Sequence, residues 1–113
     1  MNYVILVGRV GDQPKIITEK PVAKFSLATN EYYKNKAGEN VTETEWHNVV
    51  FFQSVEFISK AVNKGDLVFV QGKIVTRTWK DQKGDPHWAT EIIGKQIELL
   101  KSNTKKEEEE PVF

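Results

Sequence analysis

The chain of 113 residues contains no cysteine. This absence excludes disulfide bonds and thiolate metal sites, and it is compatible with a reducing compartment. No run of 18 apolar residues is present either, so the sequence predicts no membrane-spanning helix. The first residues, MNYVILVGRVG, form too short an apolar run for a signal peptide and lack a small-residue cleavage site. We therefore expect a cytoplasmic protein without a targeting signal.

Residues that could carry out catalysis are also scarce. The two histidines, His47 and His87, have no cysteine partners and no close metal-ligand spacing. No glycine-rich loop resembles a phosphate cradle, and the pattern places no two carboxylates together for acid–base work. The sequence therefore predicts a protein that is not an enzyme, with no metal and no cofactor.

The net charge of zero is the sum of two unlike parts. The chain has 16 basic and 16 acidic residues, and four of the acidic ones are Glu107, Glu108, Glu109 and Glu110. The residues before them therefore carry about +4, and the end of the chain cancels that charge. Such segregation is typical of an acidic interaction tail.

Short β-rich segments dominate the rest of the chain, and a chain of this length fits one domain. Alternation of side chains and the positions of turn residues predict five strands, at 2–10, 22–30, 44–52, 66–79 and 87–100. A short extension follows the first strand, and Gly94 interrupts the last one. The one predicted helix spans 54–65, with Ser54 as its cap and Gly65 at its end. Residues 31–43 are predicted to form a long hairpin loop, and residues 80–86 a turn.

This order of elements predicts an all-β protein. Five strands with one helix between the third and fourth form the layout of an OB-fold Greek-key barrel. The alternative is a half-open sheet packed by one helix. We expect the barrel to occupy residues 1–100, followed by a short linker at 101–106 and a disordered acidic tail at 107–113.

The strand at 44–52 has two largely apolar faces, where a one-sided barrel strand has one. Trp46, Asn48, Val50 and Phe52 alternate with His47, Val49 and Phe51. One face fills the barrel. The other closes a subunit interface, forms a stacking platform, or is extra core beneath a loop or helix.

Further aromatic residues lie beside basic ones at the hairpins. Trp79 follows Arg77, while Tyr32 and Tyr33 precede Lys34 and Lys36. Aromatic residues beside basic ones are typical of proteins that bind single-stranded nucleic acid, since bases stack on the rings while Lys and Arg contact phosphates.

Five collinear blocks carry a resemblance to a known family: NYVILVGRVG, FSLATNE, TEWHNVVFF, VNKGDLVFVQGKIVTRTWKDQ and ATEII. Together they resemble the bacterial-type single-stranded DNA-binding proteins of replication. The resemblance implies an OB-fold that binds single-stranded DNA without sequence preference during replication, recombination and repair, in the nucleoid. It also implies a homotetramer, with Tyr3, Ile5 and His47 at the subunit interfaces.

The resemblance and the residue pattern together assign the candidate binding residues. Base stacking is assigned to Tyr33, Trp46, Phe52 and Trp79, with Trp88 a candidate for stacking or for hairpin packing. Phosphate binding is assigned to Lys34, Lys36, Lys64, Lys73 and Arg77. Asn48, Val75 and Thr78 replace basic residues of some members, which predicts a shallower salt dependence. A protein-docking barrel, a nuclease on the same scaffold and an RNA-binding protein remain alternatives.

The chain ends in an acidic run followed by a terminal aromatic residue. Members of the family often end in this way, and replication and repair proteins bind that end. The resemblance therefore implies a partner-docking tail formed by Glu107, Glu108, Glu109, Glu110, Pro111, Val112 and Phe113. The linker is short, so the tail reaches less far and could compete with DNA for the basic face.

Overall fold

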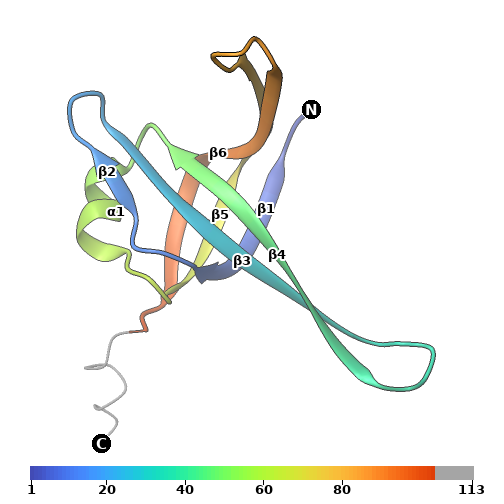
Figure 1. Cartoon of the computed structure of the whole chain (residues 1–113). Helices are drawn as coiled ribbons and strands as arrows, with labels where there is room; N and C mark the ends of the chain where they lie inside the picture. The colour runs from blue at the N-terminus through green and yellow to red at the C-terminus, as the bar shows by residue number, and fades with distance from the viewer. Residues whose placement is uncertain (104–113) are drawn as a thin grey trace, which may run out of the picture.

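The computed structural model describes residues 1–103, which form six strands and one helix (Figure 1). In chain order the elements are β1 (Val4–Val10), β2 (Lys15–Ile17), β3 (Val22–Lys34), β4 (Asn40–Phe51), α1 (Val55–Ala61), β5 (Leu67–Lys80) and β6 (Pro86–Lys101). The strands follow one another in the sheet as β1-β5-β6-β4-β3-β2. The acidic tail lies outside the described residues.

The sheet closes on itself because β1 pairs with two strands. Val4 to Arg9 run antiparallel to β5, and Arg9 and Val10 also pair with Ala28 and Leu27 of β3. A Cβ at Gly8 would run into the Ala28 carbonyl, so glycine permits this close crossing. β4 and β6 pair in parallel. The prediction of an OB-fold barrel is confirmed, and the half-open sheet is not observed; short β2 is added beside β3.

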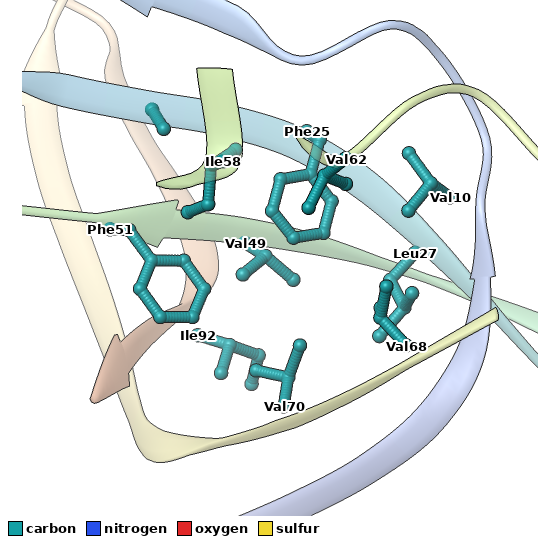
Figure 2. Packing of buried hydrophobic residues seen from close by; sticks show 11 residues of the cluster. Val10, Phe25, Leu27, Val49, Phe51, Ile58, Val62, Val68, Val70 and Ile92 are labelled. Carbon is teal, nitrogen blue, oxygen red and sulfur yellow. The ribbon is translucent and has the colours of Figure 1, made fainter. Parts of the chain in front are cut away.

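The barrel interior holds a continuous apolar core (Figure 2). Phe51 and Leu27 are the largest fully buried apolar side chains, and Phe25 stacks on Phe51 at a ring distance of 6.3 Å. Ile58 and Val62 complete the cluster from α1 and the residue after it. The helix therefore contributes to the core of the barrel.

The helix is shorter than its sequence predicts. It spans Val55–Ala61, and Val62 is its C-terminal cap. Ser54 is the N-cap residue, as predicted, but it has a positive φ of 62° and its side chain makes no capping hydrogen bond. Gly65 lies in the turn beyond the helix, where its φ of 90° suits glycine.

The predicted long loop at 31–43 is also wrong. β3 extends to Lys34 and β4 begins at Asn40, so only residues 35–39 form the turn. The two strands stay paired throughout, and the Asn35 side chain accepts hydrogen bonds from the Ala37 and Glu39 amides at 2.9 Å each. The result is a long β3–β4 hairpin that projects from the barrel, as β5 and β6 also do (Figure 1).

Gly94 does not divide the last strand. β6 is continuous from Pro86 to Lys101, and its register with β5 shifts by one residue between Gln71 and Gly72. A β-bulge accounts for the shift, since Gly94 faces Gly72 while Gln96 faces Gln71. The bulge bends the strand around the barrel without ending it.

Candidate nucleic-acid interface

Alternate residues of β4 point away from the core and form the centre of the candidate site. Val49 and Phe51 are buried, whereas Trp46 and Phe52 are each 60% exposed. The two rings are therefore not extra core within the described chain. Together with the neighbouring outward residues of β3, β5 and β6, they form a surface that we call the outward face.

The Trp46 ring packs against Gly11. A Cβ at Gly11 would overlap the Trp46 ring and come within 2.7 Å of the Ser26 hydroxyl. Asp12 fixes that neighbourhood, because its carboxylate accepts hydrogen bonds from the Ser26 amide (2.9 Å) and hydroxyl (3.0 Å). The Trp46 ring thus packs against Gly11 on one side and remains accessible to solvent.

The outward face continues along the β3–β4 hairpin. Ala28 faces Trp46, Asn30 faces Thr44, and Tyr32 faces Thr42 in the strand register. Because side chains alternate between the two faces, Tyr32 shares the side of Trp46 and Tyr33 lies on the opposite side. Tyr32 is 74% exposed. The structure therefore adds Tyr32 to the stacking candidates and separates Tyr33 from Trp46.

A groove of about 380 Å³ opens on the same face beside Phe52. Its apolar walls are Ile17, Val22, Val50, Phe52, Val75 and Ile93, and its charged residues are Glu19, Lys20, Lys24, Arg77 and Glu91. Arg77 and Glu91 form a two-pronged ion pair: Nε donates to Oε1 at 2.9 Å and Nη2 to Oε2 at 3.0 Å. The hydrogen bonding to Glu91 and the negative charge of Glu91 raise the pKa of Arg77.

Beyond Arg77, the face extends onto the β5–β6 hairpin. The Arg77 guanidinium carbon lies 5.7 Å from the centre of the Trp79 ring, and Trp79 stacks on His87 at 5.7 Å. His87 also lies 2.8 Å from Asp81, and its hydrogen bond to that carboxylate lowers the pKa of Asp81, assisted by the Asp85 amide. Trp79 is therefore held in place and half exposed.

Trp88 lies on the other side of this hairpin. It faces Thr78, whereas His87 faces Trp79, so the two tryptophans point to opposite sides. Trp88 is exposed. The structure does not bring it together with Trp46, Phe52 and Trp79.

The predicted phosphate-binding residues occupy different parts of the molecule. Lys73 precedes Val75 and Arg77 on the outward side of β5, and Lys34 lies at the end of β3 on the side of Trp46. Lys36 is in the tight turn of the β3–β4 hairpin. Lys64 lies in the turn after α1, where its amide donates to Gln13 at 3.2 Å, and so belongs to no strand of the face.

A second groove lies along β1, on a different side of the barrel. Its volume is about 440 Å³, and Ile5, Val7, Thr29 and His47 are among its lining residues. His47 Nε2 lies 2.8 Å from the Thr29 hydroxyl. Tyr3, Ile5 and Val7 are all about half exposed. The structure brings Ile5 and His47 together, and we call this surface the β1 groove.

Residues 1–103 have neither a metal-binding cluster nor a membrane-spanning helix. They contain no group of three His, Asp or Glu side chains placed to hold a metal ion. The one helix in this part of the chain is too short and too polar to cross a membrane.

Residues 1–100 match the Single-strand binding protein family. The chain belongs to this family. Among solved structures, the Plasmodium falciparum SSB in complex with ssDNA is 38% identical, with a TM-score of 0.78 over 88% of this chain and 95% of that one.

Two other structures share the fold. A deletion mutant of the single-stranded DNA binding protein from Thermus aquaticus is 22% identical, with a TM-score of 0.76 over 91% of this chain and 52% of that one. The mitochondrial single-stranded DNA binding protein of S. cerevisiae is 24% identical, with a TM-score of 0.68 over 89% and 96%. This chain thus spans about half of the Thermus protein and nearly all of the other two.

Several residues of the outward face were not identified from the sequence. Lys24 and Ser26 alternate with buried Ala23 and Phe25, so the period of two already places them outward. Glu91 carried no such signal, because its pairing with Arg77 depends on the register of two long strands.

Proposed function

We propose that this protein binds single-stranded DNA without sequence preference and thereby coats and protects it during replication, recombination and repair. The observation that carries the proposal is the run of exposed rings on one face. Trp46, Phe52 and Trp79 project from β4, from its end and from β5, with Lys24, Lys73 and Arg77 on the same side. Membership of a non-catalytic, single-strand-binding family supports it.

The physical basis is stacking combined with charge. Each ring offers a π-surface to a base, and stacking of this kind contributes about 1–3 kcal/mol per base. Because every base has a π-face, such binding tolerates any sequence. The lysines supply phosphate contacts, so affinity falls as salt rises. A duplex hides its bases in the stack, which favours the single strand.

We test this function by titrating the protein with oligo-dT and following tryptophan fluorescence. Stacking of bases on Trp46 and Trp79 should quench the emission strongly, and the affinity should fall with added salt. Duplex DNA of the same length serves as the control and should quench less. Absence of quenching by oligo-dT at low salt would contradict the proposal. An oligo-rU titration compares RNA with DNA, since stacking alone does not distinguish the sugars.

The proposal includes a homotetramer whose interfaces involve the β1 groove. Ile5 and Val7 of β1, and Tyr3 just before it, expose apolar side chains, and an exposed apolar surface of this kind favours association with another chain. A closed symmetric assembly would let one DNA strand contact several barrels and gain avidity. Native mass measured with and without a long oligo-dT gives the subunit number and the DNA stoichiometry together.

We also propose that the acidic tail recruits replication and repair proteins. The last described residue, Asn103, is held at the barrel, where its amide donates to the buried Asp66 carboxylate at 2.8 Å. Ten residues follow it. Since an extended chain covers about 3.3–3.6 Å per residue, the tip can reach no more than about 36 Å from that point. A partner must therefore approach this end of the barrel closely.

Deleting residues 107–113 tests the tail. We expect oligo-dT binding to be unchanged or tighter, because four negative charges are removed while the outward face is untouched. Capture of replication and repair proteins known to bind such acidic ends should be lost. A matched control keeps the four glutamates and replaces Phe113 by alanine, which separates the aromatic contact from charge. Equal capture by the full-length and truncated proteins would contradict the docking role.

A further inference from the structure

Arg77 differs from the other predicted phosphate-binding residues in being paired already. Within residues 1–103, the four predicted lysines, Lys34, Lys36, Lys64 and Lys73, take part in no ion pair, whereas Arg77 does. Its partner Glu91 presents two oxygens to Nε and Nη2 at 2.9 and 3.0 Å. The Glu91 side chain is 12% exposed, whereas that of Arg77 is 56% exposed. The carboxylate thus lies in the groove beneath the guanidinium.

The geometry matters because a carboxylate and a phosphate compete for the same donors. A guanidinium binds either group through two parallel N–H bonds, which give these contacts their strength. In Arg77, the fork formed by Nε and Nη2 is fully used by Glu91. A phosphate can approach only the remaining Nη1 side, or it must displace Glu91. As long as Glu91 stays in place, it already compensates the positive charge of Arg77.

Stability of the fold does not explain a carboxylate at this position. Glu91 faces Val75 in the register, and Ile93 follows it on the same side, so an apolar residue would suit the groove wall. Ion pairs with one largely exposed member contribute little to stability. A negative charge in a groove proposed to hold a polyanion is also unfavourable for binding. The Arg77–Glu91 ion pair therefore weakens the DNA binding that the other residues of the outward face favour.

We propose that Glu91 limits the affinity for single-stranded DNA by occupying Arg77. This inference rests on the proposed function of the outward face. Binding exchanges the Arg77–Glu91 contact for an Arg77–phosphate contact, and it leaves the partly buried Glu91 carboxylate without its cation. The protein consequently holds the strand less tightly and releases fewer counterions than its basic residues alone predict. A strand held in this way is released more readily.

The test is the salt dependence of oligo-dT binding by Glu91→Gln. The amide keeps the shape of the side chain and can still accept from Nε, but it removes the compensating charge. We expect tighter binding at low salt. In the variant, the Arg77–phosphate contact no longer leaves an unpaired carboxylate that attracts a cation. Net counterion release should therefore rise by the equivalent of about one phosphate contact, which steepens the slope of log affinity against log salt by about 0.7. The advantage of the variant over the wild type should then shrink by about 2.6-fold between 50 and 200 mM salt.

Two further variants separate this effect from a change in net charge. Glu98→Gln removes one negative charge from the same strand, where Glu98 is exposed and its carboxylate accepts a hydrogen bond from Gln96. It should leave the slope unchanged. Arg77→Gln should weaken binding more in the Glu91→Gln background than in the wild type, since only there does Arg77 contact phosphate without first giving up an ion pair.

The outcomes decide the inference in either direction. Tighter binding with a steeper slope, specific to position 91 and dependent on Arg77, supports it. An unchanged slope, weaker binding, or an equal effect of Glu98→Gln overturns it while wild-type binding stands. Failure of the wild type to bind oligo-dT overturns the proposed function as well. Should Glu91→Gln not fold, Glu91→Val offers an apolar side chain to the groove wall and carries the same expected result.

Discussion

Replacing Trp46 by alanine is expected to weaken oligo-dT binding roughly 5- to 150-fold, the equivalent of about 1–3 kcal/mol for one stacked base. Trp46 is 60% exposed, so its removal takes away a stacking surface without opening a cavity in the core. The unfolding temperature should therefore change little. Anisotropy of a fluorescein-labelled oligo-dT measures the affinity without relying on the fluorescence of the removed ring.

Phe57→Ala is the matched control for this prediction. Phe57 is also an exposed aromatic residue, at 42% against 60% for Trp46, but it lies on α1 and not on the outward face. Its loss should leave the affinity near the wild-type value, because it removes no ring from that face. Equal effects of the two variants would mean that exposed rings bind DNA wherever they lie, and the outward face would lose its special status.

Replacing Gly94 by alanine should lower the stability of the barrel markedly. Its added methyl group would overlap the ring of Phe51, which is fully buried and packed on Phe25. Forcing extra atoms into a close-packed core costs about 1–3 kcal/mol. Urea unfolding at a fixed protein concentration measures the loss as a lower midpoint. Oligo-dT affinity of the folded fraction should stay near the wild-type value, because Gly94 lies beneath the face.

A compensating variant checks the mechanism of this loss. Phe51→Leu removes part of the ring that the new methyl group would meet, so Gly94→Ala should cost less in that background. If the two changes simply add, the clash with Phe51 is not the cause. The bulge between Gln71 and Gly72 would then be the alternative origin, since a Cβ at Gly94 also alters the closest approach of β5 and β6.

The barrel could be predicted from the sequence because its strands alternate between a buried and an exposed face. Ala23, Phe25 and Leu27 are buried, so apolar side chains recur at every second residue of that strand, as the sequence indicates. The β3–β4 hairpin could not be recognised from Glu31 onward, because both of its faces are largely exposed and most of its side chains are polar, so no apolar face marks the strands. Hydrogen bonds between facing residues hold it instead, such as Thr44 to Asn30 at 2.6 Å.

The stacking residues could be predicted in part for a related reason. Trp46 and Phe52 stand out because the opposite face of the same strand already supplies Val49 and Phe51 to the core. Which of Tyr32 and Tyr33 lies on the side of Trp46 follows from the register of the β3–β4 hairpin. The sequence predicted a loop there, so it gave no register. The partner of Arg77 likewise depends on which residues of β5 and β6 face each other.

The central claim is that single-stranded DNA lies along the outward face and not in the β1 groove. Photocrosslinking of the full-length protein to an iododeoxyuridine-substituted oligonucleotide, followed by mass spectrometry of the peptides, tests it most directly. The account predicts crosslinks at Trp46, Phe52 and Trp79, and a lower yield when unlabelled oligo-dT competes. Crosslinks confined to Tyr3 and to the residues of β1 would contradict it.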